Sequence, residues 1–274
     1  MEPFDDLLAQ HGFQVEDALV RAGLRGIAVA GNGRGRSLVS VVGGAVDPAS
    51  LQERPGWDLP LRLAETITTD DGERTMVVEA LPDGVALVRL TGPGPAGGAG
   101  GVARAAGAPA PTPVRTPAFA QSMAERFATA NADGVTVGHL VPELVFVDPH
   151  SLELVGFAQR PLRADAGAAP IHGAGRLFGA AYRTPSGLKS LPGTPADDVF
   201  LLAALLWRWR HGTDPFEGPL LDRMTRTVAG QPVSGAAEGS SLDRDSLDSL
   251  LLRAFAAVPE RRPSAADLAA ALRA

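Results

Sequence analysis

Residues 135–159, VTVGHLVPELVFVDPHSLELVGFAQ, are the stretch that decides the fold. Two apolar runs within it, Val145–Val147 and Leu152–Val155, predict short β-strands. The four residues between them, Asp148-Pro149-His150-Ser151, are of turn-forming types. The stretch therefore predicts a strand–turn–strand unit that follows an irregular loop containing Pro142.

The chain after this unit is mostly helical in pattern. Thr194 is followed by Pro195 and Asp197, a cap, a proline and a carboxylate that predict a helix over Asp197–His211, ended by Gly212. This helix is apolar almost all round, so we expect it to lie at the centre of the domain. Further helices are predicted over about 243–257 and after Ser264-Ala265-Ala266-Asp267.

One helix is also predicted just before the opening stretch. Thr116 and Pro117 begin it, Phe119, Met123 and Phe127 repeat at helical spacing, and Gly134 ends it.

The N-terminal part is rich in strand patterns. Two short helices are predicted near 4–10 and 15–22. After them, a meander of about five antiparallel strands is expected, with turns at Asp70-Asp71-Gly72 and Pro82-Asp83-Gly84. The expected strands are Ile27–Ala30, Leu38–Val42, Leu61–Thr68, Thr75–Ala80 and Val85–Leu90. A short helix over Asp47–Arg54 is a further possibility, stopped by Pro55-Gly56.

Residues 92–113 separate these two parts. They are almost entirely Gly, Ala and Pro, a composition that cannot bury an apolar face and is typical of a flexible linker or insertion. The predicted organisation is therefore 1–91, a linker or insertion over 92–113, and 114–274.

Composition excludes several classes of function. The 274 residues carry a formal net charge of −6, so no global basic field favours nucleic acid or anionic lipid. There is no cysteine, which excludes thiolate chemistry and disulfides. No apolar run is long enough to span a membrane, and a cytoplasmic location is expected. Lys189 is the only lysine.

Several segments together resemble the bacterial branch of the eukaryotic-like (Hanks-type) Ser/Thr protein kinases. They are Asp198-Val199-Phe200, Gly212-Thr213-Asp214-Pro215-Phe216, Pro259–Ser264, Tyr182–Ser186, Gly156-Phe157-Ala158, and the positions of Leu140, Pro142 and Glu143. The resemblance implies a two-lobed α+β protein-kinase-like fold with a small antiparallel β-rich N-terminal lobe and a mainly helical C-terminal lobe. It covers about 115–274 well and is weak before the linker.

The same resemblance implies that the chemistry is missing. The catalytic aspartate corresponds to His139, the metal-binding asparagine to Leu144 and the metal-binding aspartate to Gly156. A magnesium ion would find no carboxylate there. The phosphate-gripping lysine is absent from the N-terminal part, where only an arginine such as Arg34, Arg36 or Arg62 could supply charge.

The favoured hypothesis is therefore a pseudokinase that binds other proteins as a scaffold or regulator, with no cofactor and no Mg-ATP binding. One alternative is an active or nucleotide-binding kinase that uses His139 as the base. A relative of the small-molecule phosphotransferases is a third reading, which the 198–216 and 259–264 segments disfavour.

Two residues are expected to keep scaffold roles. Asp198 corresponds to a buried aspartate that binds the catalytic-loop backbone in the family. Arg262 corresponds to an arginine whose glutamate partner is Ser186 here, so we expect it to use a different acceptor.

Other candidate sites have simpler explanations beside them. Gly31, Gly33 and Gly35 could form a phosphate loop, but Asn32-Gly33 is also a strong turn signal, and a hairpin turn is favoured. His139, Glu143 and Asp148 could bind a metal, although a structural histidine is favoured.

Exposed threonines are candidate phosphorylation sites. Thr68, Thr69, Thr112 and Thr116 could be modified by a partner Ser/Thr kinase and then bind a forkhead-associated domain, as inactive members of the family can. Ordinary loop threonines are the simpler interpretation.

Overall fold

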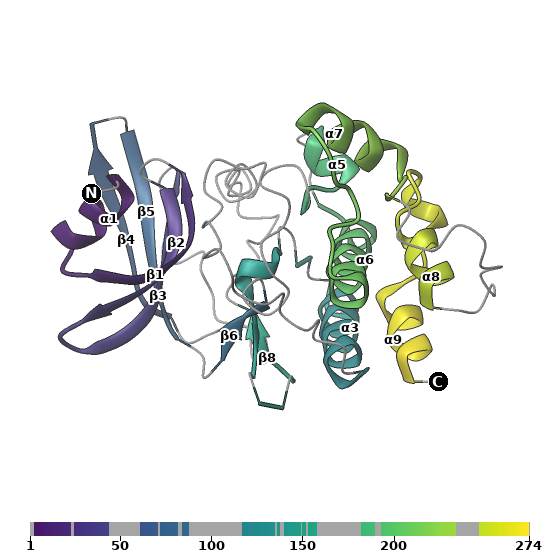
Figure 1. Cartoon of the computed structure of the whole chain (residues 1–274), viewed down its shortest axis with the longest axis horizontal. Coiled ribbons are helices and arrows are strands. Elements are labelled where there is room, and N and C mark those ends of the chain that lie inside the picture. Colours follow the sequence, from purple (N-terminus) through teal and green to yellow (C-terminus); the bar gives the residue numbers. More distant parts are fainter. Residues whose placement is uncertain are drawn as a thin grey trace, which may run out of the picture.

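The computed structural model describes residues 3–22, 25–43, 61–70, 72–81, 84–87, 117–134, 136–137, 140–148, 150–151, 153–157, 182–189, 193–233 and 247–273. The predicted linker over 92–113 and the possible helix over 47–54 lie outside these residues. The fold is of the α+β class, with a strand-rich N-terminal part and a mainly helical C-terminal part (Figure 1).

The N-terminal part is helix α1 (Pro3–Gln10) and a five-stranded antiparallel sheet. Its order is β1-β2-β3-β5-β4, so the predicted simple meander is wrong: β5 lies between β3 and β4. The hairpins predicted at Asn32-Gly33 and at the turn before Gly72 are present as β2–β3 and β4–β5. The hairpin predicted at Pro82-Asp83-Gly84 is wrong, because the strand that begins at Val85 does not pair with β5. The strands are β1 (Gln14–Ala22), β2 (Arg25–Asn32), β3 (Gly35–Gly43), β4 (Leu61–Thr69) and β5 (Gly72–Ala80).

Strand β1 occupies the segment for which a helix was predicted over 15–22, and that prediction was wrong. The pairing of β1 with β2 shifts register between Val15 and Asp17 and again between Ala18 and Val20. Each irregularity interrupts the period-two alternation, so that adjacent Ala18 and Leu19 are both buried. The resulting pattern resembles the spacing of a helix.

The two faces of this sheet have different partners. Helix α1 covers one face, where Phe4 and Leu8 belong to a small core with strand residues such as Val39 and Met76. The opposite face, which carries Leu38, joins the main core of the molecule. Figure 1 shows α1, the sheet, a small second sheet and the helices following one another along the long axis.

The small sheet contains β6 (Val85–Ala86), β7 (Val145–Val147) and β8 (Leu154–Phe157), all antiparallel. Strand β6 therefore pairs with β7. The meander prediction placed this strand in the first sheet, and that placement is wrong. Strand β8 begins two residues later than predicted.

Helix α6 (Pro195–His211) is the centre of the C-terminal part and is buried along nearly its whole length, as predicted. Thr194 and Asp197 form a reciprocal capping box, and Gly212 ends the helix at φ +73°. Figure 1 shows α6 between the small sheet and the last helices. The other helices are α3 (Pro117–Ala132), α5 (Pro185–Leu188), α7 (Leu220–Ala229), α8 (Leu247–Ala254), α9 (Ala265–Arg273) and the 3-10 turns η2 (Pro142–Leu144) and η5 (Pro259–Arg261).

Helix α7 was not predicted from the sequence. Its buried residues are Arg223 and Thr227, whereas Leu220 and Leu221 are exposed. The helix therefore has no apolar stripe facing the core, and this is the pattern on which helix prediction depends. Within the described residues, no helix has the length and apolar character needed to cross a membrane.

Candidate functional site

Leu144 occupies the position that the resemblance assigns to a metal-binding asparagine. It is the last residue of η2, and its side chain is 3% exposed within the main core. The Leu144 N–H donates to the carbonyl of Val141 at 2.9 Å. A buried leucine side chain offers no oxygen to a hard cation such as magnesium, so this position has become part of the core.

Gly156 occupies the position assigned to the metal-binding aspartate. It lies inside β8, paired with Phe146 of β7, so the strand continues through this position. The next residue, Phe157, is fully buried and meets Phe127 of α3 edge-on, with ring centroids 6.0 Å apart. Arg126 lies over the same ring, with its guanidinium carbon 5.8 Å from the centroid. These contacts pack β8 against α3.

Asp148 shapes the turn between β7 and β8. Its Oδ1 accepts hydrogen bonds from the backbone N–H groups of Ser151 and His150, both at 2.7 Å. These bonds hold the pKa of Asp148 below its ordinary value because they stabilise the charged carboxylate. The carboxylate is therefore already used within the turn.

Nothing in the described part of the chain gathers three histidine or acidic side chains into a metal site. His139 lies outside the described residues, and so does the side chain of Glu143. The metal site considered for His139, Glu143 and Asp148 is therefore untested as a set.

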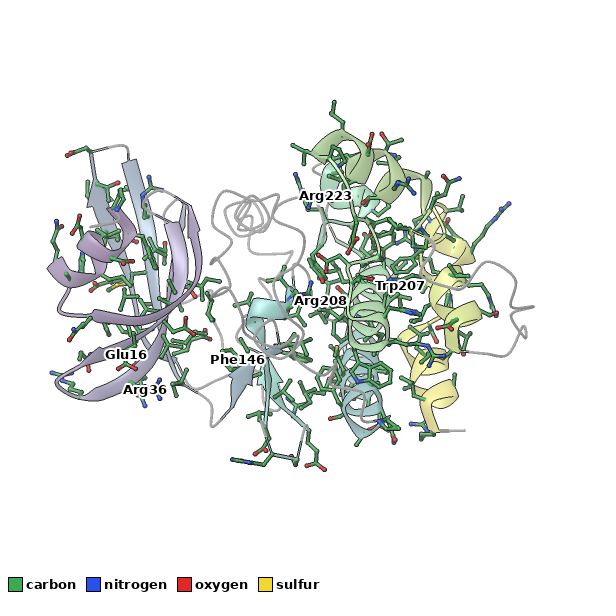
Figure 2. The ribbon with its side chains drawn as sticks, viewed as in Figure 1. Glu16, Arg36, Phe146, Trp207, Arg208 and Arg223 are labelled. Atoms are coloured by element: carbon green, nitrogen blue, oxygen red, sulfur yellow. The ribbon has the colours of Figure 1, made fainter. Side chains whose placement is uncertain are left out.

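Two of the arginines that could replace the missing lysine are bound within the five-stranded sheet. Arg36 Nε lies 2.6 Å from Oε2 of Glu16, and Arg62 donates to the Arg36 carbonyl at 2.9 Å and to Ser37 Oγ at 3.0 Å. Figure 2 shows Glu16 and Arg36 together at one end of this sheet, away from the C-terminal helices. Arg34 is exposed in the β2–β3 turn.

Gly31, Gly33 and Gly35 all lie at this β2–β3 hairpin, as the turn interpretation expects. Gly35 has φ +120°, a conformation that favours glycine. At Gly31, an added Cβ would lie 2.7 Å from Oε1 of Glu16. The glycine thus leaves room for the Glu16 side chain to reach across β2 to Arg36.

Asp198 connects α6 to the segment before His139. Its Oδ2 accepts from the backbone N–H of Val137 and from the Asn131 amide, both at 2.7 Å. The aspartate is almost fully buried, so these bonds fix the end of α3 and the chain that follows it onto α6. This is the type of contact that the resemblance assigns to Asp198.

Arg262 has acceptors other than the residue at 186. It donates to the carbonyls of Ala196 and Ala256 at 2.8 and 2.9 Å, and its Nη1 lies 3.3 Å from Oδ1 of Asp197. Arg262 therefore pairs with the carboxylate of Asp197, while position 186, where the resemblance places a glutamate, is a serine.

Three buried polar side chains, which the sequence did not predict to be together, join α6 to the segment before α5. They are Tyr182, Arg208 and Asp214. Oδ1 of Asp214 accepts from the Tyr182 hydroxyl and from Arg208, each at 2.5 Å. Burial raises the pKa of Tyr182 well above its ordinary value, and the Asp214 charge adds to the effect. Burial alone would lower the pKa of Arg208, but Tyr182 and Asp214 more than offset this and raise it.

Tyr182 and Asp214 both belong to segments that carry the resemblance. No local pattern pairs them, however, because 32 residues separate them. Figure 2 shows Arg208 and Trp207 on α6.

The threonines on β4 differ in their availability. Thr68 is exposed, whereas Thr69 is partly buried and its hydroxyl donates to the Gly72 carbonyl at 2.7 Å. Thr112 and Thr116 lie outside the described residues.

Comparison with known proteins supports the fold and leaves the sequence family open. No protein-family model matches the chain, and no curated protein matches it. Many solved structures do match it, and two of them are kinase domains of PknI from Mycobacterium tuberculosis. The single-mutant form has a TM-score of 0.57 and 17% identity over 96% of this chain and 94% of the other. The double-mutant form has a TM-score of 0.56 and 17% identity over the same shares.

These likenesses cover both the sheet-rich part and the helical part. At 17% identity they are evidence of the fold, which agrees with the order of elements described above. The chain has the two-lobed α+β fold of a protein kinase domain.

Proposed function

We propose that this chain is a catalytically inactive kinase-fold protein, a pseudokinase, which acts as a protein-interaction scaffold or regulator in bacterial signalling. The observation that carries the proposal is the packing of Leu144 and Gly156. Leu144 is a core side chain, and Gly156 of β8 is paired with Phe146 of β7.

Catalysis of phosphoryl transfer depends on positioned metal ions and on neutralisation of the phosphate charges. Neither position offers a side-chain ligand atom, and the chain contains no lysine before Lys189. The hydrogen bond between the Val137 N–H and Asp198 supports the view that the kinase fold is retained while its metal-binding residues are lost.

A thermal-shift titration tests this proposal. A ligand at ten times its dissociation constant stabilises the native state by about 1.4 kcal/mol. We expect the same melting temperature with millimolar ATP and magnesium as with ATP and a chelator, and no ATP turnover. Magnesium-dependent stabilisation with turnover, lost in His139→Ala but kept in His150→Ala, would instead support the active kinase. His150 is an exposed turn residue and serves as the matched control.

We also propose that the partners are proteins, among them a Ser/Thr kinase and a forkhead-associated domain that binds a phosphorylated threonine. Thr68 supports this because its side chain is exposed on β4, an edge strand of the sheet. After treatment with a partner kinase, the chain should bind such a domain. Binding should fall in a variant with Thr68, Thr69, Thr112 and Thr116 changed to alanine. Equal binding by that variant would exclude these four sites.

A further inference from the structure

Helix α7 presents polar residues to the interior and apolar residues to solvent. Arg223 and Thr227, four residues apart on one face, are 7% and 0% exposed. Leu220 and Leu221 are 54% and 75% exposed. Figure 2 shows Arg223 on the side of α7 that faces α5 and α6. This arrangement reverses the usual burial pattern of a surface helix.

Arg223 differs from the other buried arginines of the C-terminal part. Arg208 and Arg262 each meet a carboxylate, Asp214 and Asp197 respectively. Within the described residues, Arg223 has no ion pair and its buried Nε has no acceptor, and the buried Thr227 hydroxyl also has none. A buried donor without an acceptor is costly, so an anion that accepts a hydrogen bond from the Arg223 Nε–H would stabilise the protein.

The neighbouring element offers a second spare donor. Helix α5 packs against α7, and Arg183 precedes it. One Arg183 nitrogen donates to the Gly187 carbonyl at 2.8 Å, while its buried Nε has no acceptor among the described residues.

The local charge is also positive. Residues 183–189 and 217–230 carry four cations (Arg183, Lys189, Arg223 and Arg226) and two carboxylates (Glu217 and Asp222), which gives +4 − 2 = +2. The chain as a whole carries −6. This surface is therefore locally complementary to an acidic partner.

We propose that α5 and α7 form a docking surface for an acidic segment of a partner protein. Arg223 and Arg183 bind an oxyanion of that segment, either a carboxylate or a phosphoryl group. Leu220 and Leu221 cover an apolar side chain beside it. The docking role rests on the proposed scaffold function, whereas the anion chemistry rests on the unpaired Arg223.

The arginine Nε–H resonances in ¹H–¹⁵N NMR spectra report the site directly, and the resonance missing in Arg223→Lys identifies Arg223. The probes are three peptides of one leucine-containing sequence with a central glutamate, phosphoserine or glutamine, together with inorganic phosphate. We expect the glutamate or phosphoserine peptide to shift the Arg223 Nε–H resonance and the glutamine peptide to leave it in place. A shift by only one of the two acidic peptides identifies the source of the oxyanion.

Matched variants separate this site from general charge attraction. Arg223→Gln should weaken peptide binding by roughly 30-fold or more, as expected for loss of one partner of a buried charge pair. Arg226→Gln, an exposed arginine on the same helix, should change it by less than about threefold. Leu221→Ser should weaken the peptides and leave inorganic phosphate unaffected.

A stability measurement without any probe gives a second readout. Arg223→Met should leave the melting temperature unchanged or raise it, because it removes a buried Nε–H donor that has no acceptor among the described residues. Arg208→Met should lower the melting temperature, because it leaves the buried Asp214 carboxylate without its cation.

Three results would overturn the docking surface: no shift with either acidic peptide, equal weakening by Arg223→Gln and Arg226→Gln, or phosphate binding as tight as peptide binding. Magnesium-dependent ATP turnover would contradict the proposed function and leave this readout unchanged.

Discussion

Arg262 and Asp197 join the last segment of the chain to the beginning of the central helix. Arg262 Nη1 lies 3.3 Å from Oδ1 of Asp197, while Oδ2 of the same carboxylate accepts from the Thr194 backbone and hydroxyl at 3.0 and 2.9 Å. The arginine carbon also lies 5.1 Å from the centroid of the Phe200 ring. Burial lowers the pKa of Arg262, and the Asp197 charge partly opposes this effect. A single carboxylate thus completes the helix cap and pairs with a buried cation.

Replacing Arg262 with glutamine should lower the free energy of unfolding by about 3–5 kcal/mol, because Asp197 would remain buried without its cation. Urea denaturation measures this loss. The control is Arg273→Gln, which breaks an exposed pair with Glu125 and should cost less than about 1 kcal/mol. Equal losses in both variants would mean that the Arg262 contacts contribute little.

Gly230 ends α7 at a point where the backbone of another segment approaches closely. It has φ +65°, and an added Cβ would lie 2.0 Å from the Phe255 carbonyl oxygen. Gly134 has a similar φ of +71°, but an added Cβ there would meet nothing within 4 Å. The two glycines therefore share a backbone conformation and differ in the space around them.

We expect Gly134→Ala to cost about 1 kcal/mol, the penalty of a left-handed conformation alone. Gly230→Ala should cost more than about 4 kcal/mol or prevent folding, because the clash is with backbone and not with a flexible side chain. Thermal or urea unfolding of both variants makes the comparison. Losses of similar size would show that the segment at Phe255 can move aside.

Sequence reasoning found the elements whose signals are local. The cap at Thr194, the glycine stop at Gly212 and the unbroken apolar character between them define α6 without any knowledge of its neighbours. It failed where the pattern depends on distant partners. Strand β1 was missed because two register shifts disturb its alternation, and α7 was missed because its buried residues are Arg223 and Thr227.

The candidate site divides in the same way. That Leu144 and Gly156 cannot bind a metal through their side chains follows from residue type alone. That Gly156 lies within a continuous strand, and that Asp197 becomes the partner of Arg262, depends on packing between segments far apart in the chain. The pairing of Tyr182 with Asp214 has no local signal for the same reason.

Restoring an asparagine at position 144 should destabilise the protein and leave magnesium binding absent. Leu144→Asn places an amide in an apolar core site and should cost about 3 kcal/mol or more. Leu221→Asn, the same change at an exposed position, should stay within about 0.5 kcal/mol. Chemical denaturation measures both, with and without magnesium. Magnesium-dependent stabilisation of Leu144→Asn would show instead that a metal site is close to complete.

Tyr182 should make the folded protein sensitive to alkaline pH. It is the only tyrosine, so tyrosinate absorbance near 295 nm reports this group alone. Burial raises its pKa in the folded state. Above the ordinary value of about 10, the unfolded chain therefore loses the proton while the folded protein keeps it. The contribution of the Tyr182 proton to the free energy of unfolding is fully present below pH 10. Above pH 10 the free energy of unfolding should fall by up to about 1.4 kcal/mol per pH unit. Tyrosinate should appear together with loss of circular dichroism, whereas in urea it should titrate near pH 10.

Tyr182→Phe should remove this extra slope and cost about 1–2 kcal/mol at neutral pH through loss of the Asp214 hydrogen bond. Reversible tyrosinate formation near pH 10 with the circular dichroism unchanged would contradict a buried Tyr182 hydroxyl.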